Sequence, residues 1–354
     1  MGAGPMAGRR ARGRWVGLTA LAAALALIGA ACSQANASGS SGKVPLVVYS
    51  AQGYDAAMVT AFQRATGIPT KLVDDSTGPL LARVQAEKDN PQWDILWVDG
   101  ATAFAALDQE GLLHRGFEPS VAFTSVGQQL IPSDKSYIPT GVTTMAAVVY
   151  DSSKVSSPPT SWQDLLSPQW SNAIGMNDPS VSGPTYGFVA GMMQQLGGAA
   201  QGEAFFEKLK ANGLQVFQTN GDTLHALTTG QIKLALVQSS AGIGAGLQAS
   251  SIKSVFLPTQ TLMPGCIGIS AGAKGAVLQE AERFAEFVLS RAGQKVQQGG
   301  DPQGDSLYWP VLSSVAPLPA LPDLSALQTQ IIDPTLWGPR EAGINQWFDA
   351  NIRG

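Results

Sequence analysis

The chain has 354 residues, of which 44% are hydrophobic and 14% are charged. This composition is that of an ordinary globular protein, which excludes a disordered or fibrous chain, and the length allows two compact lobes or one large domain. The formal net charge is −4, and it falls to −8 when the first 31 residues, with their four arginines, are set aside. An acidic body of this kind argues against nucleic acid as a partner.

The N-terminal segment has the pattern of a bacterial secretory signal. Four arginines precede an uncharged run from Trp15 to Ala31, and small residues lead up to Cys32. We therefore predict a cleaved signal over residues 1–31. An uncleaved membrane anchor is the alternative, because the run is near the lower length limit for crossing a bilayer.

The letters "LIGAACSQ" resemble the lipobox of bacterial lipoproteins, in which the cysteine becomes the lipid-modified first residue. Gly29 departs from that pattern, since a branched aliphatic residue is usual there. The resemblance implies lipidation at Cys32 and a lipid anchor to the outer face of the cytoplasmic membrane. Residues 32–44, rich in Ser and Gly, then form a flexible tether. Cys266 is left without a partner, so we expect a small buried apolar group there and no disulfide.

A first series of strands and helices begins near Pro45. Short apolar runs predict strands at 46–50, 68–75 and 93–100, and helical spacing of apolar residues predicts a helix over 55–66. Two further helices are expected, one opened by Pro79 and one ending at Gly111. Strands that alternate with helices predict a mostly parallel sheet covered on both faces.

A second α/β series lies between two long β-prone stretches, 137–151 and 253–273. Such an arrangement predicts one lobe inserted into another through a pair of crossing strands, with a ligand cleft between two α/β lobes. We expect the first lobe to comprise residues 45–142 plus 258–297, and the second to comprise 143–257 plus 298–354. The tail is expected to form a long helix over 276–293 and a terminal helix over 338–352.

Two turns place a hydroxyl residue before Gly-Pro at the start of a predicted helix. They are "STGP" from Ser76 and "VSGPT" from Val181. A helix start offers unpaired N–H groups and the positive end of the peptide dipole, so it attracts an anion. If both turns lie at strand ends in facing lobes, each supplies half of an anion site. The alternative is a plain N-cap that holds no ligand.

Other side chains near the predicted strand ends complete the candidate site. The candidate ligand-binding residues are Ser50, Gln52, Ser76, Thr77, Gly78, Asp99, Ser182, Gly183, Thr185, Tyr186, Gln238 and Ser239. Asp55, Asp75 and Asp178 also lie close to strand ends, where capping is the alternative interpretation. The aromatic residues Tyr54, Trp97 and Trp309 are candidate walls of the cleft or members of the core.

Taken in order, the lipobox and the segments "VVYSAQGYDAAMVTAFQRATGI", "AEKDNPQWDILWVDG", "DPSVSGPTYG", "TNGDTLHALTTGQIKLALVQSSAG" and "CIGISAGAKGAVLQEAERFAEFVLSRAGQ" resemble extracellular solute-binding proteins. The branch that is most similar includes ferric-ion and phosphonate binders. The resemblance implies the type II periplasmic binding protein fold, closing over a ligand by a hinge. It also implies a monomer that has no cofactor or enzymatic activity. Such a protein delivers its ligand to the permease and ATPase subunits of an ABC importer.

The residues favour an oxyanion-bearing solute over iron. Ferric binders of this branch use adjacent tyrosines in the segment that matches "LALVQSSAG", where this chain has Gln238, Ser239 and Ser240. Neutral donors with carboxylates nearby suit a zwitterion such as an aminoalkylphosphonate. A hard trivalent cation would need more anionic oxygens, so ferric iron is the runner-up, followed by a polyamine or thiamine.

One short match points to a different class of protein. "GDSL" at 304–307 is the label of a serine hydrolase family, in which a catalytic histidine follows far downstream. Here His114 and His225 both precede the motif, so the nucleophile would lack its base. Neither histidine has a Cys or His partner at zinc-ligand spacing. We therefore treat a hydrolase as the distant alternative.

Overall fold

The computed structural model describes residues 45–354. The predictions of a signal over 1–31, of lipidation at Cys32 and of a tether over 32–44 fall outside the described residues. Within the described part of the chain, no helix combines the length and the apolar character needed to cross a membrane.

The first sheet contains three neighbouring parallel strands, as the alternation of strands and helices predicts. Its order is β11-β10-β3-β1-β2, with β4 also paired to β10, and β10 runs antiparallel to both β3 and β4. The strands are β1 (Leu46–Ser50), β2 (Thr70–Asp74), β3 (Ile95–Asp99), β4 (Tyr137–Met145), β10 (Gln260–Ile269) and β11 (Thr329–Gln330).

Alternate residues of β3 face opposite layers of helices. Ile95 and Trp97 belong to a core cluster with residues of α1 (Asp55–Thr66) and α9 (Gly275–Leu289). Leu96 and Val98 belong to another cluster, with residues of α2 (Thr77–Ala86) and α3 (Ala101–Gln109). A strand covered on both faces is apolar throughout, which explains the continuous apolar run in the sequence.

The second sheet is similarly layered. Its order is β7-β6-β8-β5-β9, and β6 is parallel to both β7 and β8. The strands are β5 (Ala147–Asp151), β6 (Ile174–Asn177), β7 (Gln215–Phe217), β8 (Leu234–Val237) and β9 (Ile252–Val255). The helices of this series are α5 (Gly183–Gln195), α6 (Ala199–Ala211), α7 (Asn220–Thr229) and α8 (Ser239–Gln248).

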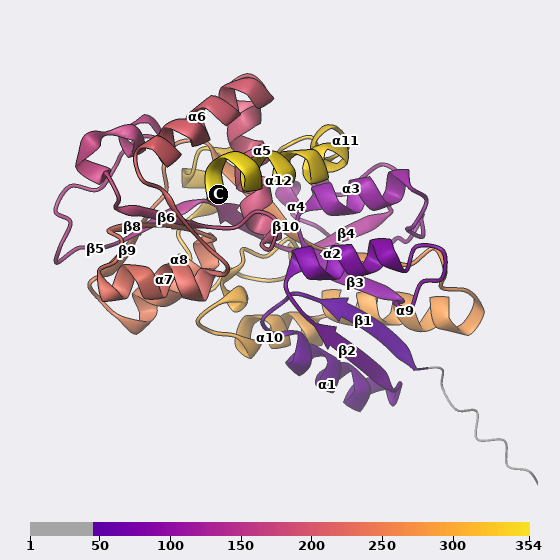
Figure 1. The fold of residues 1–354 in the computed structure, drawn as a ribbon. Coiled ribbons are helices and arrows are strands. Elements are labelled where there is room, and N and C mark those ends of the chain that lie inside the picture. The colour runs from indigo at the N-terminus through magenta and orange to yellow at the C-terminus, as the bar shows by residue number, and fades with distance from the viewer. Residues whose placement is uncertain (1–44) are drawn as a thin grey trace, which may run out of the picture. The chain divides into compact units, whose positions relative to one another are not determined.

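Two crossing connections join the sheets. Only Ala146 separates β4 from β5, and residues 256–259 separate β9 from β10. Each stretch predicted as one long β-prone segment is therefore two strands, one in each sheet, and Figure 1 shows the two groups of strands. This two-sheet α/β arrangement with a pair of crossings confirms the predicted fold class.

The prediction of a single helix over 276–293 is wrong, because the helix is interrupted at Ser290. The break separates α9 from α10 (Arg291–Gly300), and Ser290 adopts an extended conformation with ψ 162°. Its hydroxyl donates to the Phe287 carbonyl at 2.6 Å and accepts from the Gly293 amide at 3.1 Å. A Cβ at Gly293 would lie 2.1 Å from the Phe287 carbonyl oxygen, so only glycine allows this tight turn.

The C-terminal segment contacts elements of both sheets. Trp337 and Phe348, from α11 (Pro334–Trp337) and α12 (Glu341–Phe348), belong to the core cluster of the second sheet. α11 also packs on α3, beside the first sheet. The remaining α-helix of the described residues is α4 (Ser125–Gln129). Cys266 lies in β10, fully buried and unpaired, which agrees with the expectation of a small apolar group.

Candidate ligand-binding site

A polar cavity of about 130 Å³ lies where the carboxyl ends of parallel strands from both sheets meet. Its walls include residues at the ends of β2 and β3 in the first sheet and of β6, β7 and β8 in the second. The lining residues are Ala51, Ser76, Thr77, Asp99, Asn177, Val181, Ser182, Pro184, Gln218, Thr219, Asn220, Gln238 and Asp305. In open α/β sheets this edge is where ligands bind, and the volume suits a small solute.

Four helices begin at this cavity. Ser76, Ser182, Thr219 and Gln238 line it, and each is the N-cap residue of its helix, namely α2, α5, α7 and α8. A helix N-terminus carries a partial positive charge and unpaired N–H groups, so four of them together create a site for an anion without any lysine or arginine in its walls.

The two hydroxyl-Gly-Pro turns touch each other across the cavity. The Gly78 amide donates to the Val181 carbonyl at 3.0 Å. A Cβ on Gly78 would lie 2.0 Å from the Ser180 carbonyl oxygen, and one on Gly183 would lie 2.7 Å from the Asp99 carbonyl oxygen. The absence of a side chain at both glycines therefore allows the two turns to approach this closely.

The hydroxyl groups of these turns differ in how they are used. Ser182 accepts from the Thr185 hydroxyl at 3.0 Å and from the Thr185 amide at 3.4 Å, which caps α5. Thr77 is 4% exposed and lines the cavity, yet its hydroxyl has no hydrogen-bond partner among residues 45–354. The Ser76 hydroxyl is likewise unpartnered within this part of the chain. These two groups are free to donate to a ligand.

The amide side chains of the second sheet also contribute donors. Asn177 ends β6 and donates to the Asn220 side-chain oxygen at 2.7 Å. This contact orients the Asn220 amide, whose own NH₂ group has no acceptor among the described residues. Thr219 and Asp222 form a capping box that holds the start of α7 in place.

A buried acidic network lies on one side of the cavity. Asp99 accepts from the Gln52 amide at 2.9 Å and from the Tyr308 hydroxyl at 2.7 Å. The Gln238 amide donates to the Tyr308 hydroxyl oxygen and, at 3.4 Å, to Asp305. Asp305 also accepts from the Gly53 amide at 2.8 Å. The cavity thus has two carboxylates in its walls and no basic side chain.

Burial raises the pKa of both carboxyl groups above the ordinary aspartate range. For Asp305, the negative charge of Asp99 raises the pKa further, because two carboxylates in one site repel each other. The hydrogen bonds from Gln52 and Tyr308 act in the opposite direction on Asp99. A positively charged group in the cavity would favour the ionised form of both.

Several candidate residues from the sequence surround the cavity without lining it. Ser50 is buried and accepts from the Gln52 amide N–H at 3.2 Å. Thr185 caps α5 together with Ser182. Tyr186 donates to the Trp337 carbonyl at 2.6 Å, and Ser239 contacts the Thr143 hydroxyl at 2.7 Å. These four side chains support the site or the core through contacts within the protein.

The candidate aromatic residues also lie in the core. Tyr54 packs edge to face on Trp97 at 5.3 Å between ring centroids, and its hydroxyl donates to Gln52. The indole of Trp309 donates to the Pro322 carbonyl at 2.8 Å. None of these rings lines the polar cavity.

The other acidic candidates are engaged elsewhere. Asp178 accepts from Arg353 at 2.9 Å and from Ser180. Asp75 accepts from the Ser76 amide at 2.7 Å, which is a turn contact. Asp55 is buried, and burial raises its pKa to about 6.

Sequence reasoning missed five polar lining residues, Asn177, Gln218, Thr219, Asn220 and Asp305, and three apolar ones, Ala51, Val181 and Pro184. Thr219 and Asn220 stand in "TNGD", a capping signal that could have been recognised. Asp305 belongs to the "GDSL" segment, and no local pattern connects it with Asp99.

The hydrolase motif has a structural role here. Ser306 is 1% exposed, its hydroxyl donates to the Gln297 carbonyl, and it accepts from the Asp301 amide at 2.9 Å. His114 lies 3.9 Å from Glu282, far in sequence from the motif. Among the residues that the structure describes, no group of three or more His, Cys, Asp and Glu side chains is placed to hold a metal ion.

Comparison with known proteins gives one family and several distant relatives. The family model described as bacterial extracellular solute-binding protein matches residues 57–329. A periplasmic protein of Salmonella typhimurium, provisionally named for binding 2-aminoethylphosphonate, is 23% identical over 266 residues, which cover 73% of this chain and 74% of the relative. The major ferric iron-binding protein of Neisseria meningitidis serogroup B is 26% identical over 264 residues, which cover 71% of this chain and 77% of that protein.

Solved structures share the fold. The periplasmic binding protein AfuA from Actinobacillus pleuropneumoniae, solved with fructose-6-phosphate, superposes with a TM-score of 0.76 at 20% identity. The match covers 87% of this chain and 98% of that one. A likeness of this extent and low identity is a likeness of fold.

Proposed function

The chain belongs to the family of bacterial extracellular solute-binding proteins, and on that premise we propose that its solute is a zwitterion with a phosphonate or related oxyanion at one end and an ammonium group at the other. Members of this family are the solute-binding components of ABC importers and are not enzymes. An aminoalkylphosphonate has the proposed chemistry. The single observation that carries the proposal is the pairing of four helix N-termini with two carboxylates in one small cavity.

The oxyanion end is supported by the donors that the protein leaves unused. Thr77 and Ser76 offer hydroxyls, Asn220 offers an amide NH₂, and the backbone amides of Thr77 and Asn220 stand at the first positions of α2 and α7. Buried donors of this kind are satisfied when an anion binds, and hydrogen bonds to a charged acceptor are among the stronger ones.

The ammonium end is supported by Asp99 and Asp305. Both line the cavity, and no lysine or arginine in its walls neutralises them. Burying two carboxylates without a cation is costly, so a ligand ammonium beside them would relieve both desolvation and mutual repulsion. The same pair would repel a simple anion such as inorganic phosphate. This contrast favours a zwitterion over phosphate or sulfate.

Ferric iron is the second candidate, and one contact favours it. Tyr308 donates to Asp99 at 2.7 Å, so a phenol does stand next to a carboxylate at the cavity, although it comes from a different segment than the tyrosines expected for iron binders. A hard trivalent cation prefers several anionic oxygens, and burial raises the pKa of the Tyr308 hydroxyl well above its ordinary value. A bare cation would also leave the neutral donors of the four helix starts without an acceptor.

Isothermal titration calorimetry with four solutes tests the proposal. We expect 2-aminoethylphosphonate to bind, ethylphosphonate and ethanolamine to bind at least ten-fold more weakly, and ferric citrate not to bind. The first comparison removes the ammonium and the second removes the phosphonate. Saturable binding of ferric citrate with no heat from 2-aminoethylphosphonate would establish the iron alternative instead.

A matched pair of variants assigns the two ends of the ligand. Asp305→Asn should reduce the preference for 2-aminoethylphosphonate over ethylphosphonate, because it removes one charge facing the ammonium. Asp323→Asn changes an exposed aspartate that caps a short 3-10 helix and does not line the cavity, and it should leave that preference unchanged.

We further propose that the mature protein is lipid-anchored through Cys32 and works as a monomer with permease and ATPase subunits. The basis is the lipobox-like "LIGAAC" together with the family membership. Metabolic labelling with a fatty acid should mark the wild-type protein and leave Cys32→Ser unlabelled. Labelling of both proteins, or of neither, would contradict the anchor.

A further inference from the structure

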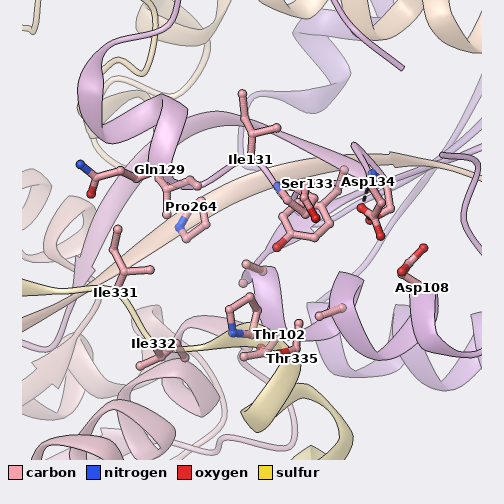
Figure 2. A pocket seen from close by; sticks show the side chains of 18 of the residues that line it. Thr102, Asp108, Gln129, Ile131, Ser133, Asp134, Pro264, Ile331, Ile332 and Thr335 are labelled. Atoms are coloured by element: carbon pink, nitrogen blue, oxygen red, sulfur yellow. Dashed lines mark hydrogen bonds between the residues drawn. The ribbon is translucent and has the colours of Figure 1, made fainter. Parts of the chain in front are cut away.

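A second cavity, separate from the polar one, lies beside α3, the start of β10 and the connection between α4 and β4. Its volume is about 230 Å³, and it shares no lining residue with the polar cavity. Figure 2 shows its interior, with Ile331 and Ile332 toward one end and Asp108 and Asp134 toward the other. Nothing in the proposed transport of a zwitterion uses this space.

The walls of the second cavity are mostly apolar. Ala105, Leu130, Leu262, Met263 and Ile332 line it and are all buried. Side chains that face an open volume lose the packing contacts that a filled core would supply. An apolar cavity of about 150 Å³ already admits a molecule the size of benzene, so this one is large enough for a small organic ligand.

Two hydroxyl groups in these walls are unpaired. Tyr137 is 3% exposed, lines the cavity and packs its ring on Phe104 with 5.4 Å between centroids. Its hydroxyl has no hydrogen-bond partner among residues 45–354, and the same holds for the hydroxyl of Thr102, which is also 3% exposed. Both residues line the cavity and neither hydroxyl donates to a protein group, so both hydroxyls are available to an acceptor atom on a ligand.

The two carboxylates at one end of the cavity, Asp108 and Asp134, share a single cation, Arg115. Arg115 donates to Asp108 at 2.7 Å and 2.9 Å, and it lies 3.7 Å from Asp134. Ser136 donates to Asp134 as well, at 2.8 Å. No lysine or arginine lines the cavity and the two carboxylates exceed their one cation, so an anionic ligand is disfavoured, and the mostly apolar walls favour a neutral ligand.

We propose that this cavity is a second binding site, which takes a small neutral organic molecule with an apolar body and one hydrogen-bond acceptor. The apolar body fills the space between Ala105, Leu262 and Ile332, and the acceptor receives the Tyr137 hydroxyl. The proposal is independent of the identity of the transported solute, because the two cavities share no residue.

Two isosteric probes test this site by saturation-transfer NMR and titration on the purified protein. Cyclohexanone carries an acceptor, and methylenecyclohexane has the same shape without one. We expect both to bind, with cyclohexanone about five-fold tighter. Tyr137→Phe should remove that difference by weakening cyclohexanone alone, whereas Tyr49→Phe, a change at a buried tyrosine that contacts Glu87 outside both cavities, should leave both affinities unchanged.

Two further experiments complete the test. One uses a variant whose larger side chain fills the cavity, and the other asks whether 2-aminoethylphosphonate competes with the probes. Ala105→Leu should abolish binding of both probes, because the added carbons occupy the cavity. An excess of 2-aminoethylphosphonate should displace neither probe. The proposal is overturned if neither probe binds, if 2-aminoethylphosphonate displaces them, or if Tyr137→Phe leaves the cyclohexanone affinity intact. The Tyr137 comparison decides the matter even if Ala105→Leu does not fold, since removing an unpaired hydroxyl costs no internal hydrogen bond.

Discussion

Individual residues around the polar cavity differ in how much of their hydrogen-bonding capacity the protein itself uses. Ser182 and Thr219 cap their helices, so their oxygens are engaged before any ligand arrives. Thr77 is as well buried as a core residue, yet its hydroxyl is left unpaired in this part of the chain. A hydroxyl that lines the cavity without a protein partner is available to donate to a ligand.

Thr77→Val isolates that hydroxyl. Valine has nearly the same shape, so the change removes one hydrogen bond to the phosphonate and little else. We expect the affinity for 2-aminoethylphosphonate to fall by about 1.5 to 3 kcal/mol, roughly ten-fold to a hundred-fold, with the free energy of unfolding unchanged or raised. Calorimetric titration measures the first quantity and urea denaturation the second. Thr60→Val, at an exposed position of α1, serves as the control and should alter neither.

The carboxyl pair predicts a pH dependence of binding. Burial raises the pKa of Asp99 and Asp305, and repulsion by Asp99 raises that of Asp305 further, so both groups take up protons at a higher pH than ordinary aspartates. If the ammonium of the ligand binds the ionised pair as proposed, binding must expel protons when the pH is below those raised pKa values. Affinity should weaken as the pH falls from about 8 to about 5, and it should level off at the upper end, where the pair is already ionised.

Titrations of the wild type and of Asp305→Asn at several pH values test this dependence. The variant has one titrating group fewer and no repelling neighbour for Asp99, so its profile should be flatter. The ionisation of the phosphonate itself is common to both proteins and cancels in the comparison. Parallel profiles for the two proteins would contradict the assignment of the ammonium to this pair.

At the scale of secondary-structure elements, the candidate site is a cavity at which four helices begin. α2 comes from the first sheet, and α5, α7 and α8 come from the second, so the proposed anion site has all four helix starts only when the elements of both sheets are in contact. The hydrogen bond from Gly78 to Val181 and the close approach of Gly183 to Asp99 are the points where the two sets of elements meet. The two sets of elements can therefore approach this closely only if neither glycine carries a side chain.

Gly78→Ala should hinder that closure. Its Cβ would lie 2.0 Å from the Ser180 carbonyl oxygen, and the clash exists only while the two turns touch. We expect the affinity for 2-aminoethylphosphonate to fall by at least ten-fold and the ligand-free protein to keep its stability, as measured by calorimetry and by thermal unfolding.

Gly221→Ala is the matched control for this change. Gly221 also lies in the first turn of a helix near the cavity, but it is exposed, and a Cβ there would lie 3.6 Å from the Thr219 hydroxyl oxygen, an ordinary contact distance. The Gly221→Ala protein should bind 2-aminoethylphosphonate with the affinity of the wild type. A Gly78→Ala protein with unchanged affinity would show that binding does not require the contact between the turns.

At the scale of the whole molecule, two sheets are joined by two crossing connections, and each sheet has its own core clusters. The core clusters of the first and second sheets consist of different residues, and the chain crosses between the sheets only at Ala146 and at residues 256–259 before the C-terminal segment. If the proposed ligand contacts both sides of the cavity, it should favour the arrangement in which both sets of contacts are made.

Ligand should therefore stabilise the protein by mass action and remain chemically unchanged. At a hundred-fold excess over Kd, binding to the folded state adds about 2.7 kcal/mol to the free energy of unfolding. We expect Tm to rise steadily with the logarithm of the 2-aminoethylphosphonate concentration, while ³¹P NMR shows no new phosphorus species. Consumption of the solute would instead indicate an enzyme.

Much of the fold could be predicted because it follows from local periodicity. The helix expected at 55–66 is α1 to the residue, and the strand expected at 46–50 is β1. The breaks that were missed, at Ala146 and at Ser290, depend on how the chain continues in space. Ser290 is an ordinary serine in the sequence, and only the tight packing of Gly293 against Phe287 shows why the helix stops there.

The site was predictable in the same uneven way. Ser76 and Ser182 carry a capping signal in their own few residues, and Asp99 stands at the end of an apolar strand, so each could be selected as a candidate. Asp305 and Tyr308 could not, because their importance comes from contacts such as that between Tyr308 and Asp99, which are 209 residues apart in the chain.

By itself, then, the amino-acid sequence determined where most strands and helices form and where helices such as α2 and α5 begin, since these depend on neighbours within a few residues. The tertiary structure alone decided that two turns touch across a cavity, that Asp305 joins Asp99, and that a second cavity opens beside Tyr137. Contacts of that kind depend on how distant segments pack, and no short-range pattern records the packing.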